Sequence, residues 1–175
     1  MKKVFLIFAK QNQEANKTIA GIMEKLTNDE REKDRKSYYK NLSGLFCHNS
    51  GATVYFLNLM KDAAGDNAAV QKALKPLAKY QDFKGKLTEE QWKQALSFSA
   101  AADKAMVDFV NALEDKDFEA PVKTDWYKGK PATTPLHFMM EQLISHNMHH
   151  RGQISQILDS LKIENDYSGI NVKFL

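Results

Sequence analysis

The sequence predicts an all-α fold in which four long helices form a four-helix bundle. Three observations lead to this prediction. Only eight glycines and four prolines interrupt 175 residues, apolar side chains recur every three or four positions over long segments, and the segments between them are polar. A chain of this length with 43% hydrophobic residues can fill one core, so we expect residues 1–175 to form a single domain.

The first two long helices are predicted from their apolar spacing. One covers about residues 3–26, and its expected inward side chains are Phe5, Phe8, Ile19, Ile22, Met23 and Leu26. The other covers about residues 40–61, with face positions three and four apart at Leu42, Leu45, His48, Ala52, Tyr55 and Leu59. Between them, residues 27–30 resemble a helix cap.

The third long helix has the clearest start. Thr88 is followed three residues later by Gln91, which is the spacing of a capping box, and the pattern continues to about residue 113. Its expected apolar face consists of Trp92, Leu96, Ala100, Met106, Phe109, Val110 and Leu113. The preceding connection, residues 62–87, is too long for a hairpin turn, and we expect a short helix at about residues 67–79. This long crossover lets the second and third long helices run in the same direction.

The last long helix follows an irregular segment at residues 117–133. The alternating Val122-Lys123-Thr124 and a turn at residues 129–131 predict a short extended excursion there. We expect Thr134 to cap the helix and Pro135 to occupy its first position, with the helix running to about residue 162.

Charge and cysteine content exclude several classes of protein. The net charge is only +3, and the densest charged run, residues 31–36, alternates in sign as a solvated surface does, so no nucleic-acid partner is expected. The single cysteine, Cys47, cannot form an intramolecular disulfide, which favours a reducing compartment. The apolar start at residues 4–9 lacks a signal-peptide cleavage site, and no apolar run reaches the ~18–20 residues that span a bilayer. We therefore expect a cytoplasmic protein without membrane contact.

Helical phase separates the histidines of the last helix. His146 and His150 lie one turn apart on the apolar face, whereas His149 falls at its polar border and His137 lies in the first turn. Two imidazoles at positions i and i+4 can share a cation, although inward histidines are often only hydrogen-bonded core groups. His48 lies on the apolar face of a different helix, where an imidazole needs a partner to offset its burial. A metal ion is one such partner, and a hydrogen bond is the other.

The segment at residues 146–153, HNMHHRGQ, resembles the H-x-x-H-H-R-G-Q signature of the DinB/YfiT-like family, and residues 38–48 resemble that family's second-helix region. The resemblance covers these two segments well and the whole chain loosely. It implies a four-helix bundle of up-down-down-up order, often a homodimer, in which His48, His146 and His150 bind one divalent metal ion and His149 does not. Many relatives have an acidic residue about five positions after the first histidine, where this chain has Thr53.

Three residues near these segments have two interpretations each. Gly152 inside a helix indicates either close approach of a backbone or substrate, or a tolerated glycine. Arg151 either binds an anionic substrate at a pocket rim or makes a surface or dimer contact. Tyr55 either presents its hydroxyl to the site or packs in the core with the hydroxyl paired locally.

Three protein ligands leave a tetrahedral zinc ion with one open position, which is typical of catalytic rather than structural zinc sites. Zinc is the expected metal, with nickel, iron or manganese as alternatives. Metal-bound water reaches a pKa of ~7, and a thiol is bound as its nucleophilic thiolate. Members of the resembled family include thiol-dependent S-transferases, so we favour activation of a low-molecular-weight thiol as the small-molecule substrate.

Three alternatives stay open at this point. One is metal-assisted hydrolysis, another is non-enzymatic binding of a metal or small ligand, and the third is an empty vestigial site. The sequence assigns no catalytic residue and no organic cofactor. Glu141 is the acid nearest to the motif but faces away from it, and no pattern links Cys47 to a base.

Overall fold

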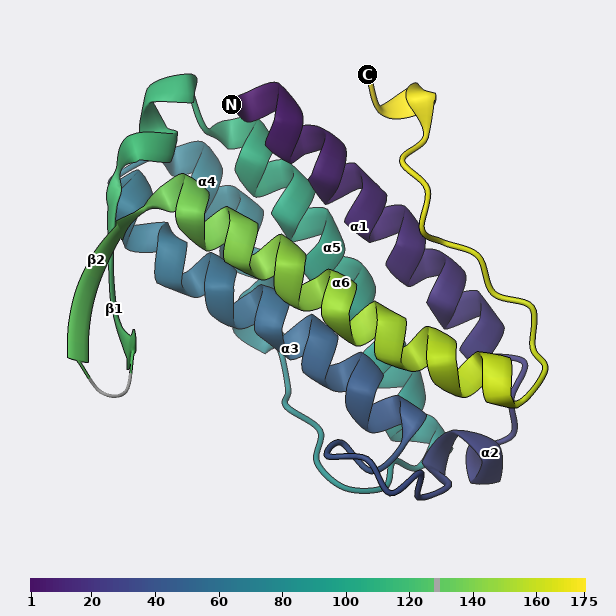
Figure 1. Ribbon diagram of the computed structural model, residues 1–175. Coiled ribbons are helices and arrows are strands. Elements are labelled where there is room, and N and C mark those ends of the chain that lie inside the picture. Colours follow the sequence, from purple (N-terminus) through teal and green to yellow (C-terminus); the bar gives the residue numbers. More distant parts are fainter. Residues whose placement is uncertain (128–129) are drawn as a thin grey trace.

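The computed structural model describes residues 1–127 and 130–175. Within these residues, the helices of 20 or more residues are α1 (Lys2–Met23), α3 (Leu42–Lys61), α5 (Glu89–Ala112) and α6 (Leu136–Ser160). They lie alongside one another, with α1 and α3 each in contact with both α5 and α6 (Figure 1). The structure is mostly helical, which confirms the predicted helical class.

Shorter elements connect and extend these helices. They are α2 (Asn28–Glu32), η1 (Asp62–Ala64), α4 (Ala68–Leu74), η2 (Lys75–Lys79), η3 (Asp115–Glu119) and η4 (Val172–Phe174). The predicted short helix within the crossover is confirmed, because α4 and η2 together occupy it and both pack against α5. None of the helices in the described ranges has both the length and the apolar character needed to cross a membrane.

Both predicted capping signals are present. The Thr88 hydroxyl accepts from the Gln91 backbone N–H at 3.2 Å, and the Gln91 side chain accepts from the Thr88 N–H at 2.9 Å. Thr27 and Glu30 form the same reciprocal pair at the start of α2. Both caps could be predicted from the sequence because each depends only on residues three positions apart.

The predicted extended excursion is a hairpin of β1 (Pro121–Tyr127) and β2 (Lys130–Pro135) that projects from one end of the helices (Figure 1). Lys130 and Pro131 of the predicted turn belong to β2, and Gly129 lies outside the described residues. The predicted Thr134 cap is wrong, since Thr134 pairs with Val122 in the hairpin. Helix α6 instead begins at Leu136, whose backbone N–H donates to the Ala120 carbonyl at 2.9 Å.

Two apolar clusters fill the space between the long helices. One contains Phe5, Leu57, Met106, Phe109 and Leu136, and the other contains Ile19, Leu42, Leu45, Trp92 and Ile154. Each long helix also buries polar residues in its interior turns. We call these residues the polar layer: Asn12, Asn16, Asn49, Thr53, Asp103, Asn147 and Arg151.

The polar layer explains two wrong predictions about helix faces. Tyr55 is 51% exposed and Ala100 is exposed, although both were expected on apolar faces. On α3 the inward positions include Asn49 and Thr53, which rotates the buried stripe away from Tyr55. A pattern of apolar residues alone cannot reveal this rotation, because polar side chains enter a core only when partners elsewhere in the chain satisfy them.

Candidate metal centre

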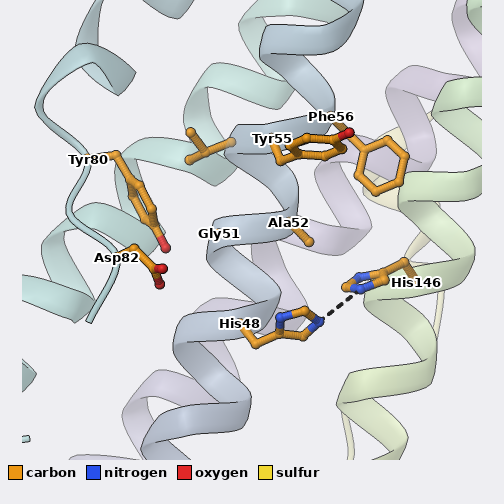
Figure 2. Close-up of a pocket in the computed structure, with 9 residues that line it drawn as sticks. His48, Gly51, Ala52, Tyr55, Phe56, Tyr80, Asp82 and His146 are labelled. Atoms are coloured by element: carbon orange, nitrogen blue, oxygen red, sulfur yellow. Dashed lines mark hydrogen bonds between the residues drawn. The ribbon is translucent and has the colours of Figure 1, made fainter. Parts of the chain in front are cut away.

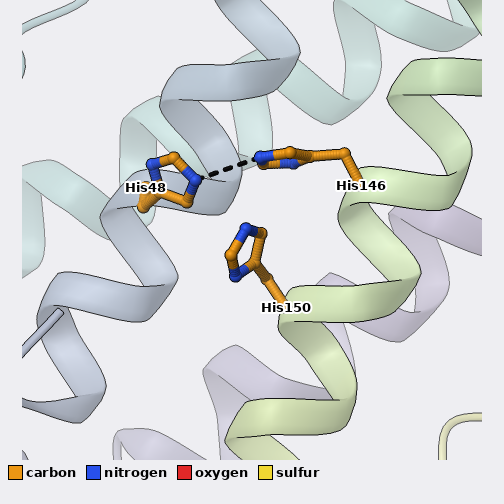
Figure 3. Close-up of side chains that lie close together, drawn as sticks. All are labelled: His48, His146 and His150. Carbon is orange, nitrogen blue, oxygen red and sulfur yellow. Dashed lines mark hydrogen bonds between the residues drawn. The ribbon is translucent and has the colours of Figure 1, made fainter. Parts of the chain in front are cut away.

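Three histidines converge between α3 and α6 (Figure 3). His48 extends from the middle of α3, and His146 and His150 extend from successive turns of α6. One ring nitrogen from each lies within 4.8 Å of the others, and the Nε2 atoms of His48 and His146 are 3.0 Å apart. The His150 ring centroid lies 4.5 Å from that of His48 and 4.4 Å from that of His146.

This arrangement fits a divalent metal ion. Tetrahedral bonds of ~2.0–2.1 Å place two nitrogen ligands roughly 3.3 Å apart, which is close to the 3.0 Å between the Nε2 atoms of His48 and His146. His149 is exposed and outside the cluster, as its helical phase predicts. His137 lies elsewhere, with Nδ1 3.4 Å from a carboxylate oxygen of Glu141.

The tautomer of His150 is set by a neighbour on the same helix. Its Nδ1 lies 2.7 Å from Oε1 of Gln153, one turn further along α6. Since a carbonyl oxygen only accepts, Nδ1 carries the proton and Nε2 keeps its lone pair. A partner of this kind is typical of histidines that bind metals.

The three imidazoles are held in their neutral form. Burial, followed by repulsion from His150 and His146, lowers the pKa of His48 to about 4. Burial and His150 lower the pKa of His146, and burial lowers that of His150 despite the hydrogen bond that His150 donates to Gln153. At neutral pH the lone pairs are therefore available to a cation.

Sequence reasoning missed Tyr39. This residue lies in the loop between α2 and α3, and its hydroxyl is 2.8 Å from Nε2 of His48. The neighbouring Tyr38 is 88% exposed. A loop has no periodicity that would distinguish the two tyrosines, so only the folded structure selects Tyr39.

A cavity of about 630 Å³ adjoins the histidines (Figure 2). His48 and His146 form one side, and the walls are largely apolar and aromatic, with Tyr55, Phe56 and Tyr80 among the residues lining it. Tyr55 thus contributes to the cavity rather than to the core. A second cavity of about 330 Å³ is lined by Tyr39 and by Gln153, the partner of His150, and it also contains the cationic side chain of Arg35. Tyr39 and Gln153 connect this second cavity to the histidines, none of which lines it.

Arg151 does not belong to the rim of either cavity. It is 4% exposed, and its guanidinium donates to Oδ1 of Asn12 and, at 3.3 Å, to Oε1 of Gln11, both on α1. Neither predicted role, anion binding or a surface contact, fits this burial. Asn147 acts similarly, since its amide donates at 3.1 Å both to Asn12 and to the hydroxyl of Thr53. The residues that follow His146 and His150 thus anchor α6 to its neighbours.

Thr53 is buried and belongs to the polar layer. The other residues singled out from the sequence are Gly152, Cys47 and Glu141. A Cβ added to Gly152 would meet no atom within 4 Å, so no protein backbone approaches it. Burial raises the pKa of the Cys47 thiol to about 12, which agrees with the expectation that it is not a nucleophile. Glu141 is exposed and lies beside His137.

Comparison with models of protein families identifies a match. The family model described as the DinB family matches residues 1–161, a range that contains all three histidines and every long helix. No curated protein matches the chain.

Proposed function

The chain belongs to the DinB family, and from this premise and the three-histidine cluster we propose that it is a metal-dependent thiol S-transferase. His48, His146 and His150 would hold one divalent metal ion, with zinc preferred. A low-molecular-weight thiol would take the open position. The proposal treats residues 1–175 as one domain of up-down-down-up order, which the contacts among the long helices and the crossover through α4 support.

The donor set supports the choice of metal. Three neutral imidazoles without a carboxylate suit zinc, nickel or iron better than magnesium or calcium, which prefer oxygen ligands. When bound, such an ion acts as a Lewis acid that favours the thiolate form of a thiol. The protein's own contribution is to present neutral nitrogens, to fix the tautomer of His150 through Gln153, and to shape the space around the open position.

One observation carries the preference for a transferase, namely a cavity lined by two of the histidines together with a second cavity lined by Tyr39 and Gln153, which contact the histidines. A transferase must accommodate a thiol and an electrophile together, whereas a hydrolase needs one organic substrate and a base. The larger cavity has apolar, aromatic walls that suit an uncharged electrophile. The smaller one contains Arg35, a cation that suits a thiol with an anionic group.

A hydrolase is the second candidate, and Asp82 is the residue that favours it. Asp82 lines the larger cavity, and its charge acts on His48. However, its side chain is 62% exposed and lies 3.5 Å from Nζ of Lys84. An exposed carboxylate that is already paired with a lysine is a poor candidate for a general base at the metal.

The proposal is tested with untagged, zinc-loaded protein, 2-mercaptoethanol and 1-chloro-2,4-dinitrobenzene. The thiolate sulfur forms a bond to the ring carbon and chloride leaves, so product formation is followed by absorbance. We expect a rate that depends on zinc and thiol, persists in His149→Ala and is lost in His150→Ala. Zinc-dependent hydrolysis of p-nitrophenyl acetate without any thiol-dependent conjugation would favour the hydrolase, and metal binding with neither activity would favour a binding protein.

Two expectations remain predictions. The family resemblance predicts a homodimer, which sedimentation velocity of the full chain would test. A cytoplasmic location is predicted from the lone cysteine, and cell fractionation would test it.

A further inference from the structure

The loop before α3 holds Tyr39 in a defined position. The Tyr39 carbonyl lies so close to α3 that a Cβ at position 44 would overlap with it, and Gly44 avoids this. Lys40 adopts a left-handed conformation with φ 67°, which is unfavourable for a residue with a side chain. The Asn41 N–H donates to the Tyr39 carbonyl at 2.8 Å. A conformation of this kind persists only where its surroundings enforce it.

The ring of Tyr39 lies against two of the three histidines. It stacks on His48 with centroids 4.1 Å apart and an angle of 25° between the planes. It also meets His150 edge-on, with centroids 5.2 Å apart. The ring therefore fixes the hydroxyl at the histidine cluster rather than in solvent.

In the structure, the Tyr39 hydroxyl lies beside the His48 nitrogen that would bind the metal. It lies 2.8 Å from Nε2 of His48, and this nitrogen is also 3.0 Å from Nε2 of His146. A neutral imidazole nitrogen has a single lone pair. Once a metal ion takes that lone pair, the hydroxyl loses its acceptor, while the stacking and the loop keep it beside the site.

We propose that Tyr39 is a catalytic residue whose hydroxyl donates a hydrogen bond to the ligand in the metal's open position. Within the proposed function, on which this reading rests, that ligand is the sulfur of the thiol. The hydrogen bond would hold the sulfur at the histidine cluster, and the larger cavity lined by His48 and His146 would receive the electrophile. An orienting bond of this kind needs no proton transfer from Tyr39.

The test uses full-length, untagged protein loaded with Co(II), whose visible spectrum reports its ligands. Azide and 2-mercaptoethanol are the two probes of the open position, and their Kd values are compared in wild type, Tyr39→Phe and the matched control Tyr38→Phe. We expect Tyr39→Phe to weaken both probes about 10-fold or more, as for a lost hydrogen bond to a charged acceptor. Co(II) affinity should stay within about threefold, and Tyr38→Phe should match wild type.

Other outcomes overturn the inference in distinguishable ways. Unchanged Kd values in Tyr39→Phe would show that the hydroxyl does not touch the bound ligand. A large loss of Co(II) affinity, with a changed ligand-field spectrum in the absence of probe, would make Tyr39 a metal ligand instead. If wild type binds azide but not 2-mercaptoethanol, the proposed thiol S-transferase function is contradicted. The azide Kd values alone then test the role of Tyr39. A wild type that binds no Co(II) overturns both proposals.

Discussion

His150 Nδ1 lies 2.7 Å from Oε1 of Gln153, and this contact determines which nitrogen of the imidazole is free to bind a metal ion. Both residues belong to α6, three positions apart, so the helix itself sets their geometry. Gln153 is thus the residue of the HNMHHRGQ segment that supports a ligand without being one.

Replacing Gln153 by leucine should weaken zinc affinity about 10–100-fold, because the ring of His150 would lose its fixed tautomer and orientation. The matched control is Gln156→Leu, since Gln156 is exposed on the same helix and contacts none of the three histidines by a hydrogen bond. Competition with a chromophoric chelator measures both affinities. Equal affinities in the two variants would mean that the hydrogen bond has no part in metal binding.

Gly44→Ala should displace Tyr39 without altering any side chain of the histidine cluster. The added methyl group would overlap with the Tyr39 carbonyl, so the loop must move, and binding of azide to the Co(II) protein should weaken as in Tyr39→Phe. Gly152→Ala is the control, because a Cβ there meets nothing within 4 Å. This control should leave azide binding unchanged and raise the free energy of unfolding by about 0.5–1 kcal/mol. Azide titrations measure the change in binding for both variants, and urea unfolding measures the change in stability.

The metal-free protein should lose stability in acid through the histidine cluster. Burial and the neighbouring imidazoles lower the pKa of His48 to about 4, and burial lowers the pKa of His146 and His150. Between about pH 6.5 and 4 the unfolded chain therefore binds protons that the folded chain does not, and the free energy of unfolding falls as the pH falls. Solvent screening limits the effect to on the order of 1 kcal/mol for each histidine.

Urea unfolding of apo wild type and His48→Gln over this pH range checks the expectation. The variant should show a smaller decrease between pH 6.5 and 4, because it lacks one of the titrating groups. The same pH dependence in both proteins would contradict the neutral state of His48 in the fold.

Asp103 should show the opposite pH dependence. Burial raises its pKa to about 8, although the hydrogen bond from Asn16 and the charge of Arg151 act in the other direction. The folded chain then retains a proton between about pH 4 and 8 that the unfolded chain releases, so this group's contribution to stability declines as the pH rises through that range.

Asp103→Asn removes this ionisation but keeps an oxygen that can accept from the amides of Asn12 and Asn16, both 2.8 Å away. We expect the variant to equal wild type near pH 4 and to exceed it by roughly 1–3 kcal/mol in free energy of unfolding at pH 8. Asp108→Asn on the same helix is the control and should change stability by no more than about 0.5 kcal/mol. Destabilisation of Asp103→Asn at every pH would instead indicate an ionised Asp103 paired with Arg151.

The sequence could predict what depends on one helix or one turn. The shared face of His146 and His150, the outward position of His149 and the capping box at Thr88 all follow from spacing within a single element. His48 could be joined to the cluster only through the family resemblance, because periodicity does not say which helices face one another.

The errors share a physical cause, since each depends on partners distant in sequence. The sequence alone favours a surface position for Arg151, because it does not show that Asn12 and Gln11 of α1 accept its hydrogen bonds. The sequence alone favours Thr134 as a helix cap, because it does not show that Thr134 pairs with Val122 in the hairpin. Tyr39 lies in a loop, and its contact with His48 depends on how that loop folds against α3, so the sequence does not distinguish it from Tyr38.

The most direct test is the metal content of untagged protein purified under metal-replete conditions, measured by mass spectrometry for wild type, His150→Ala and His149→Ala. Omitting a polyhistidine tag prevents adventitious metal binding. The account predicts one divalent ion for each chain in wild type and in His149→Ala, and its loss in His150→Ala. Wild type without metal, or His150→Ala with a full complement, would contradict the three-histidine centre.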